Sequence, residues 1–243
     1  MEANLMARYA IVIKNLWKSY NGKTVLSNIS IYVNRNEKVG IVGPNGAGKT
    51  TLLKIIAGLE DYDSGEVNIN GRVGMVFQED ILLPWMTIYE NIELGLKYQG
   101  VDDKVRRDKV YRITELLGLT QYLDYYPNMV SGGTRRKTSI ARAIVLDPDI
   151  LLLDEPFTGL DLDTTNTLIK ILSIIPSKLN MALLIVSHQF QELLQIVDRL
   201  YILGGVPSKI ADEINIRDLG REERIIKVIK AFNMPKTRYS RPS

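Results

Sequence analysis

The sequence contains no cysteine and only one histidine in 243 residues. Without cysteine the chain can form no disulfide, no thiolate metal site and no cysteine nucleophile. A single imidazole also leaves little scope for a metal site built from several histidines. Thiol chemistry and histidine-rich metal chemistry are therefore excluded as the basis of its function.

Long apolar runs and a marked excess of charge are also lacking. Apolar segments such as 150–153 and 181–186 have the length of strands, not of a membrane-spanning helix. Residues 1–4 include an acid and are not followed by the apolar core of a secretory signal. The 31 basic and 28 acidic residues leave a net charge of +3, which gives no support for a nucleic-acid-binding surface. We expect a protein of the cytosol or of the cytoplasmic face of a membrane.

What is present is the composition of a globular protein. With 45% hydrophobic residues, the chain can bury a substantial core as one compact α/β unit with a subdomain. Strand patterns that alternate with helix patterns predict a mostly parallel sheet. Strands are expected within 10–33 as a hairpin around Asn21 and Gly22, as a second hairpin near 64–71 that leads into 73–77, and at 150–153, 182–186 and 200–203. Helices are expected at 105–117 and 134–146 in an inserted helical segment from about 88 to 146, near 164–174, and from 190 onward.

Residues 43–50, with the sequence GPNGAGKT, match the pattern G-x-x-x-x-G-K-[ST] of a loop that binds nucleotide phosphates. Glycines let such a loop curl so that its N–H groups point at phosphate oxygens, while the lysine adds positive charge and the threonine can ligate Mg²⁺. A strand-like segment precedes the loop and a helix-like segment follows it, which disfavours the alternative of a glycine-rich turn without a ligand. We expect the phosphate site to be formed by Gly43, Pro44, Asn45, Gly46, Ala47, Gly48, Lys49, Thr50 and Thr51.

Two adjacent acids, Asp154 and Glu155, follow the apolar strand at 150–153. Successive side chains of a strand point in opposite directions, so the two carboxylates are expected to differ in role. Asp154 would orient the ligands of a bound Mg²⁺, and Glu155 would polarise an attacking water. Alone, the pair could be an acidic strand end, but with the loop at 43–50 it predicts the second half of a nucleotide site.

With these two motifs the chain resembles the ATP-binding cassette (ABC) ATPases, from about residue 11 to residue 205. The resemblance implies ATP hydrolysis with ATP and Mg²⁺ as cofactors. It implies an α/β fold of the P-loop NTPase (RecA-like) class, with a mostly parallel core sheet, an antiparallel β subdomain and an inserted α-helical subdomain. The implied domains are an ABC ATPase domain at 8–205, with its core at 8–86 and 148–205 and its helical subdomain at about 87–147, and a C-terminal extension at 206–243.

Four further residues match motifs of this family. Tyr20 resembles the aromatic residue that stacks on adenine, the alternative being a tyrosine on a strand surface. Gln78 resembles the glutamine that reaches Mg²⁺ and the attacking water, and Asp161 resembles a residue that links the two sites of a dimer. His188 resembles the histidine that contacts the γ-phosphate. A lone histidine is more often structural, but its position directly after a strand favours the catalytic role.

The segment VSGGTRRK at 130–137 resembles the ABC signature, whose serine and glycine amides bind the γ-phosphate of ATP held by the opposite subunit. Ser131, Gly132 and Gly133 are intact. The neighbouring positions depart from the common residues of the family. Val130 stands where leucine is common, and Thr134 stands where glutamine or methionine is common. Arg136 and Lys137 stand where glutamine and arginine are common. In isolation, the serine could be a plain helix N-cap. The resemblance implies a head-to-tail pair of chains around two ATP molecules, because one chain cannot complete a site.

One cassette without a membrane span requires a transport pore made by another polypeptide. The apolar segment ILLPW at 81–85 could be core of the helical subdomain or a groove that receives a permease helix. The residues LLPW within this segment, and the segment 200–210, are similar to importer ATPases of the nitrate, sulfonate and taurine group. This similarity implies an importer of a small anionic or sulfonate-type solute, peripheral at the cytoplasmic face of the cell membrane. Its implied partners are transmembrane permease subunits, a second ATPase chain and, indirectly, a solute-binding protein, with no nucleic acid.

Two other classes of function fit the sequence less well. A soluble ABC ATPase that acts on ribosomes or DNA is the main alternative, although such proteins usually have two cassettes in one chain or a long coiled coil. A P-loop GTPase or kinase is disfavoured because the Asn-Lys-x-Asp guanine motif is missing. In the tail, residues 221–232 are expected to form a helix packed on the core, with contact to anionic lipid or a permease as the minority view. Its apolar side would consist of Ile225, Ile226, Val228 and Ile229, and residues 235–243 are expected to be disordered.

Overall fold

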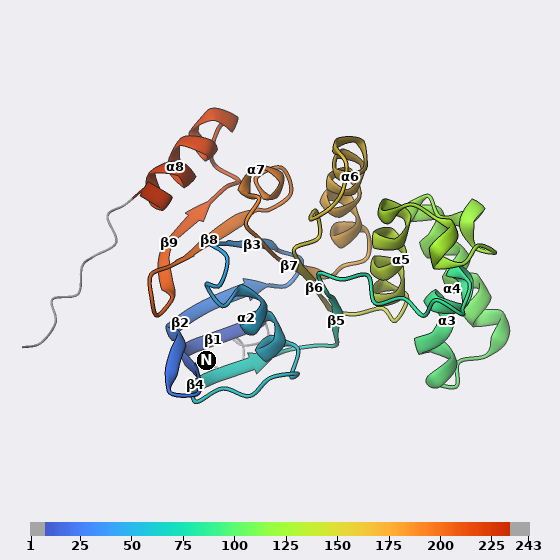
Figure 1. Ribbon diagram of the computed structural model, residues 1–243, viewed down its shortest axis with the longest axis horizontal. Coiled ribbons are helices and arrows are strands. Elements are labelled where there is room, and N and C mark those ends of the chain that lie inside the picture. Colours follow the sequence, from blue (N-terminus) through green and yellow to red (C-terminus); the bar gives the residue numbers. More distant parts are fainter. Residues whose placement is uncertain (1–7, 234–243) are drawn as a thin grey trace, which may run out of the picture.

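The computed structural model describes residues 8–233, which form two sheets and a set of helices (Figure 1). The first sheet is antiparallel, with strand order β2-β1-β4. The second has six strands in the order β5-β6-β7-β3-β8-β9, and only the β8–β9 pair is antiparallel. The strands are β1 Tyr9–Tyr20, β2 Lys23–Asn34, β3 Lys38–Val42, β4 Ser64–Ile69, β5 Val73–Val76, β6 Ile150–Asp154, β7 Ala182–Ser187, β8 Arg199–Gly204 and β9 Lys209–Asn215.

The hairpin at Asn21 and Gly22 is confirmed, because β1 and β2 pair antiparallel on either side of it. The second expected hairpin is wrong. Strand β4 pairs with β1 in the first sheet, whereas β5 pairs parallel with β6 in the second. The glycine turn that separates β4 from β5 therefore carries the chain from one sheet to the other and does not fold it back on itself.

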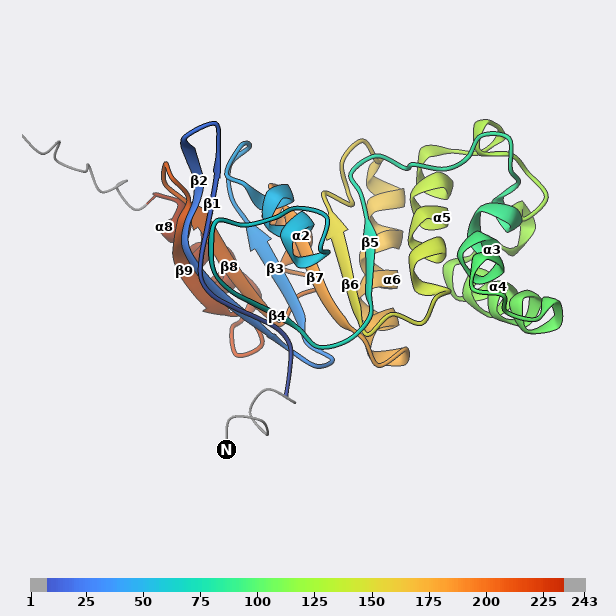
Figure 2. The same cartoon turned by 90° about the horizontal axis from the view of Figure 1, so that it is seen from below.

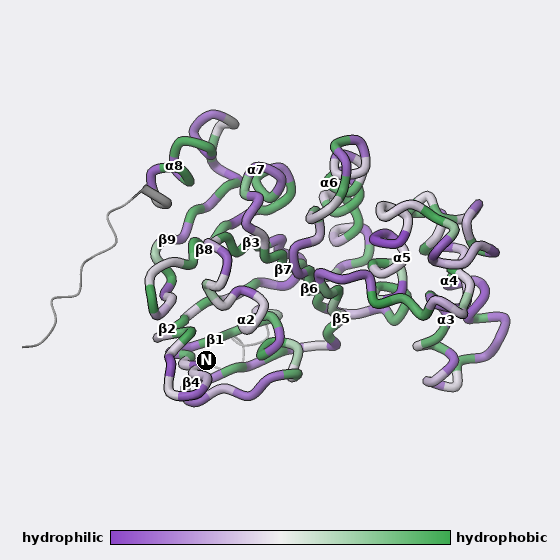
Figure 3. The backbone as a smooth tube through the Cα atoms, in the orientation of Figure 1, coloured by the Kyte–Doolittle hydropathy of each residue, from purple (hydrophilic) through white to green (hydrophobic). Residues whose placement is uncertain are grey.

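The two faces of the six-stranded sheet pack against different partners. Along β6, Leu152 joins the core shared with helix α2 and the first sheet, whereas Leu151 and Leu153 join the core shared with the helices of the other face. Figure 3 shows the central strands among the most hydrophobic parts of the chain. Strands buried on both faces are typical of a parallel sheet covered by helices. The helices are α2 Lys49–Ile56, α3 Ile88–Tyr98, α4 Asp103–Leu117, α5 Gly132–Ile144, α6 Leu162–Lys178, α7 Phe190–Leu193 and α8 Arg221–Asn233.

The inserted helical subdomain contains α3, α4 and α5, with short 3-10 turns at Thr120–Tyr122 and Pro127–Met129. Helix α3 begins with a capping box in which Thr87 and Glu90 satisfy each other's backbone N–H groups. Helix α4 ends at Gly118, which adopts the left-handed conformation that favours glycine. The whole subdomain leaves the core after β5 and returns at β6, which are adjacent strands.

The sheet continues beyond residue 205, because β9 pairs with β8. This strand was not expected from the sequence. Helix α8 follows it and buries Val228, with Ile225 partly buried, whereas Ile226 and Ile229 are 51% and 44% exposed. Only part of the expected apolar side is therefore buried against the core. The disorder predicted at 235–243 lies outside the described residues. Within residues 8–233, every helix is too short or too polar to span a bilayer.

Candidate functional site

The loop at 43–50 lies between β3 and α2 and needs glycine at several positions. Gly46 and Gly48 have φ values of 78° and 84°, in the left-handed region that favours glycine. A Cβ atom on Gly43 would lie 2.6 Å from the carbonyl oxygen of Leu203, and one on Gly48 would lie 2.7 Å from a methyl group of Leu26. Only glycine fits at these two positions, so the path of the loop follows directly from the sequence.

The start of α2 is suited to bind an anion. Its N-cap residue is Gly48, which offers no side-chain acceptor to the first N–H groups of the helix, and the first turn contains no acid. Uncapped N–H groups and the positive end of the helix dipole favour a negatively charged ligand at this place. The loop and the helix end therefore fit the phosphates of a nucleotide.

Lys49 is 6% exposed and lies within the loop. Its Nζ donates to the carbonyl oxygens of Gly43 at 2.9 Å and Pro44 at 3.2 Å. It also lies 3.4 Å from Oε1 of Glu155. The ammonium group thus connects the phosphate loop to the end of β6.

Asp154, the last residue of β6, faces the start of α2. Its Oδ1 accepts a hydrogen bond from the Thr50 hydroxyl at 3.1 Å. Burial raises the pKa of Asp154, and the bond from Thr50 opposes this shift. No group of three or more histidines, cysteines or acids that could hold a metal occurs within residues 8–233. The pair Thr50 and Asp154 fits Mg²⁺, which binds through one or two carboxylates together with substrate phosphates and water.

Glu155 is held by the end of β7. Its Oε2 accepts hydrogen bonds from the Ser187 hydroxyl at 3.0 Å and from the backbone N–H of His188 at 3.2 Å, and it lies 2.9 Å from Nδ1 of His188. Glu155 has a φ of 46°, which is unusual for a residue other than glycine. Such conformations persist where the surrounding contacts hold the residue in place. Ser187 was not predicted, although its position directly before His188 could have indicated it.

Tyr20 and Gln78 are not held by this cluster of contacts. Tyr20 ends β1 and is 39% exposed, with Nζ of Lys18 at 4.6 Å from its ring centroid. Gln78 follows β5, and its side chain is exposed and makes none of the hydrogen bonds described above. Both side chains therefore remain accessible to a ligand.

The signature residues lie apart from the phosphate loop. Ser131 is the N-cap of α5, and its hydroxyl accepts from the N–H of Thr134 at 3.2 Å. A Cβ on Gly133 would lie 2.3 Å from a methyl group of Thr164, whose N–H is capped by Asp161 at 2.8 Å. The hydrogen bonds from Thr164 lower the pKa of Asp161. Figure 2 shows strands β5 and β6 between α5 and α2, so α5, at whose start the signature residues lie, is separated from the phosphate loop at the start of α2.

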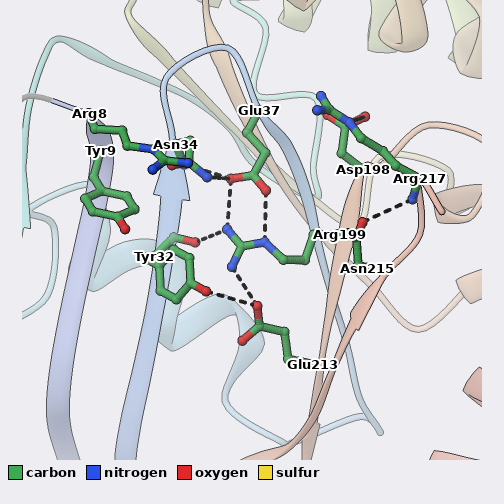
Figure 4. Close-up of a pocket in the computed structure, with 10 residues that line it drawn as sticks. All are labelled: Arg8, Tyr9, Tyr32, Asn34, Glu37, Asp198, Arg199, Glu213, Asn215 and Arg217. Carbon is green, nitrogen blue, oxygen red and sulfur yellow. Dashed lines mark hydrogen bonds and ion pairs between the residues drawn. The ribbon is translucent and has the colours of Figure 1, made fainter. Parts of the chain in front are cut away.

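A second cluster of charged residues lines a hollow of about 350 Å³ at the opposite ends of β3 and β8 (Figure 4). At its centre, Arg199 donates to both carboxylate oxygens of Glu37, at 2.9 and 2.8 Å, and to Glu213 at 2.8 Å. It also donates to the hydroxyl of Tyr201 and the carbonyl oxygen of Tyr32, both at 2.7 Å. The guanidinium of Arg199, on β8, therefore links β2 of the first sheet to β9 of the second and to Glu37, which directly precedes β3.

Comparisons with known proteins agree with this geometry. The family model described as ABC transporter matches residues 26–158. The nitrate import ATP-binding protein NrtD of Synechocystis is 38% identical over 82% of this chain and 77% of that protein. The aliphatic sulfonates import ATP-binding protein SsuB of Bacillus anthracis is 37% identical over 82% of this chain and 81% of that protein.

A solved structure gives the same fold. The ATP-binding cassette MJ0796, in a dimeric post-hydrolysis state bound to ADP and Pi, matches with a TM-score of 0.77 and 27% identity, over 85% of this chain and 99% of that one. The expected P-loop NTPase fold, with a mostly parallel core, an antiparallel sheet and inserted helices, is confirmed. The chain therefore belongs to the ABC transporter family and is an ATP-binding cassette ATPase of that family.

Proposed function

We propose that the chain is the ATP-binding and hydrolysing subunit of an importer, which pairs with a second ATPase chain and drives a separate permease. The observation that carries the proposal is the meeting of Lys49, Thr50, Asp154, Glu155 and His188 at the ends of three neighbouring parallel strands. Ligand sites of open parallel sheets lie at this edge. The roles of these residues follow from their contacts.

Lys49 and the amides of the loop bind the outer phosphates, and Tyr20 stacks on the adenine ring. Thr50, Gln78 and Asp154 would hold Mg²⁺, which would neutralise phosphate charge. Glu155 orients a water and accepts its proton, because its Oε2 is already fixed by Ser187 and His188. The His188 side chain is 42% exposed, so its ring can also reach the γ-phosphate. The loop residues Pro44, Asn45, Ala47 and Thr51 shape the phosphate site.

The separation of Ser131 from the phosphate loop supports a site shared by two chains. The second wall of each phosphate site would come from Ser131, Gly132 and Gly133 of another subunit, and Asp161 would lie where the two chains meet. The solved cassette MJ0796 is dimeric, as its description states. Two copies of the present chain in head-to-tail contact would complete two sites.

Dimer formation can be tested with Glu155→Gln, which keeps the size of the side chain and removes its basicity. With ATP and Mg²⁺ we expect a long-lived dimer in size-exclusion chromatography with light scattering, because ATP stabilises the closed pair while hydrolysis is blocked. The matched control is the double variant Glu155→Gln with Lys49→Ala, which should remain monomeric. A monomer of the single variant at saturating ATP would contradict the shared site.

A permease contact is supported by the loop before α3. Ile81 and Trp85 are 54% and 69% exposed, which argues against the alternative that this segment is subdomain core. Buried Asn91 holds the loop through bonds with the N–H of Leu83 at 2.8 Å and the carbonyl oxygens of Leu83 and Met86, both at 3.1 Å. An exposed indole on a loop that is fixed in this way is suited to a protein interface.

The partner can be tested by co-purification from the source membranes. Trp85→Ala should lose a co-purifying membrane protein and keep ATP hydrolysis, whereas Leu59→Ala, at an apolar residue just after α2 that is 59% exposed, should keep both. Loss of binding in neither variant would contradict this docking surface. We expect the chain at the cytoplasmic face of the cell membrane, peripheral to permease subunits that a solute-binding protein serves.

The names of the relatives indicate the class of solute. NrtD and SsuB are named for import of nitrate and aliphatic sulfonates, respectively. We therefore expect a small anionic or sulfonate-type solute. The measurement is ATP hydrolysis by the reconstituted complex with permease and solute-binding protein, which nitrate or a sulfonate should stimulate and an uncharged sugar should not.

A further inference from the structure

Arg136 is a buried cation in the second turn of α5. It is 4% exposed, and arginine is almost never so deeply buried without partners. Glutamine is the common residue of the family at this position, as noted from the sequence. The guanidinium group is therefore a feature of this chain that the nucleotide site itself does not explain.

The segment that follows β5 supplies two carbonyl groups and a carboxylate to Arg136. Nη1 donates to the carbonyl oxygen of Phe77 at 2.8 Å, and Nη2 donates to the carbonyl oxygen of Gln78. Nε lies 3.2 Å from Oδ1 of Asp80. Figure 2 shows this segment passing the N-terminal end of α5 on its way to α3.

Two consecutive carbonyl groups held by one guanidinium restrict the residue between them. The carbonyl of Phe77 lies in the peptide plane before the Cα of Gln78, and the carbonyl of Gln78 lies in the plane after it. Because peptide groups are planar and the guanidinium is a rigid planar fork, fixing both planes fixes the direction of the Gln78 side chain. A neutral glutamine has fewer donors and no charge to pair with Asp80.

The same helix begins at Ser131, five residues before Arg136. A helix rises by about 1.5 Å per residue, so the two residues are about 7–8 Å apart along a rigid element. We propose that Arg136 is a positioning residue of the ATPase, which sets the direction of Gln78 in its own site relative to Ser131, which serves the partner's site. The proposal rests on the roles of Gln78 and Ser131 in the proposed function.

The test is a double-mutant cycle of Arg136→Gln and Gln78→Ala. If Arg136 acts through Gln78, Arg136→Gln should lower kcat by on the order of 10-fold or more and change KM for ATP by less than about threefold. In the Gln78→Ala background the same substitution should change kcat by less than about twofold, since the residue that it positions is gone. An equal fall of kcat in both backgrounds would overturn the proposal and assign Arg136 a structural role.

The matched control is Arg112→Gln, which removes the same charge from α4 of the same subdomain. Nη2 of Arg112 lies 3.6 Å from Oδ1 of Asp147, which follows the C-terminal end of α5. We expect kcat to change by less than about twofold, because no contact to Gln78 or to the residues before Ser131 is lost. If Arg136→Gln does not fold, Arg136→Lys carries the same cycle, since lysine keeps the charge beside Asp80 but lacks the rigid planar fork that fixes the two carbonyl groups relative to each other.

The outcomes also separate this proposal from the proposed function. If Gln78→Ala leaves kcat unchanged, the role given to Gln78 in hydrolysis is wrong, and positioning by Arg136 falls with it. If Gln78→Ala lowers kcat and Arg136→Gln does not, Gln78 keeps its role and the positioning alone is overturned.

Discussion

Both ends of strand β3 adjoin a buried cation, and the two cations are bound in different ways. At the far end, the guanidinium of Arg199 makes five hydrogen bonds, to Glu37, Glu213, Tyr201 and Tyr32. This number equals its N–H donors, so its hydrogen-bonding capacity is used. At the loop end, the ammonium of Lys49 contacts two carbonyl oxygens of its own loop and one carboxylate oxygen at 3.4 Å.

The difference separates a structural charge from one that can change partners. If Arg199 moved, the carboxylates of Glu37 and Glu213 would lose the cation that they share. Lys49 can turn from loop carbonyls to a phosphate, beside helix N–H groups that no side chain caps. Substitutions at the loop end should therefore affect activity, and those at the far end should affect stability.

The largest expected effect is on activity, at the loop end. Glu155→Gln should lower ATP hydrolysis by about 10²–10⁴-fold, because the substitution removes a general base. The midpoint of thermal unfolding should change by only a few degrees, since the amide keeps the shape of the side chain. Phosphate release and calorimetry on the same sample measure both quantities. A fall in stability as large as that of an Arg199 variant would break the comparison.

Next in size is the loss of Arg199. Arg199→Met should lower the free energy of unfolding by roughly 3–5 kcal/mol, because it leaves the largely buried carboxylate of Glu37 unpaired. Denaturant titration measures this change, and kcat determined well below the unfolding temperature should stay within about twofold of the wild type because ATP does not contact this end. Adding Glu37→Gln to the variant should restore part of the stability. Loss of hydrolysis in a folded Arg199→Met protein would contradict a purely structural role.

A smaller effect concerns Tyr20, at the end of β1. If its ring stacks on adenine, Tyr20→Ala should weaken ATP binding by about 1–3 kcal/mol, the range for aromatic–base stacking. Tyr20→Phe should bind as the wild type does, because only the ring face is used. Titration with a fluorescent ATP analogue measures both. Equal affinity of Tyr20→Ala and wild type would place the adenine elsewhere.

The smallest effect concerns Tyr201, at the far end. Burial raises the pKa of Tyr201, against the opposing influence of Arg199. The folded protein thus retains a proton that the unfolded chain releases above about pH 10, so the contribution to stability is complete below that pH and declines above it. Tyr201→Phe should cost about 1–2 kcal/mol at neutral pH for the lost hydrogen bonds. Its stability should then fall less steeply above about pH 10 than that of the wild type, as denaturant titrations across this range would show.

The sequence predicts the loop end of this comparison far better than the other. The phosphate loop at 43–50 and the two acids at the end of β6 can be predicted from short sequence patterns, because a glycine-rich loop and a strand end are local features. The Arg199 cluster brings together residues up to 169 positions apart, and no local pattern connects them. Arg136 was visible in the sequence only as a departure from glutamine, since its partners are backbone atoms of a distant segment.

The errors in the fold have the same origin. The sequence after β4 predicts a turn, but a turn signal does not determine which sheet the next strand joins. Strand β9 was missed because it is largely polar, with only Ile214 buried in its burial pattern. An edge strand of this kind has a weaker hydrophobic pattern than the buried strands β6 and β7.

The insertion of the helical subdomain between β5 and β6 has a consequence for how the chain folds. Pairing of Val76 with Leu153 closes a long loop, and the loss of chain entropy precedes the gain from the contacts. The three subdomain helices pack mainly on one another and need no such closure. We therefore expect the subdomain to become protected early in pulsed hydrogen exchange and β5, an edge strand with one partner, to be among the last.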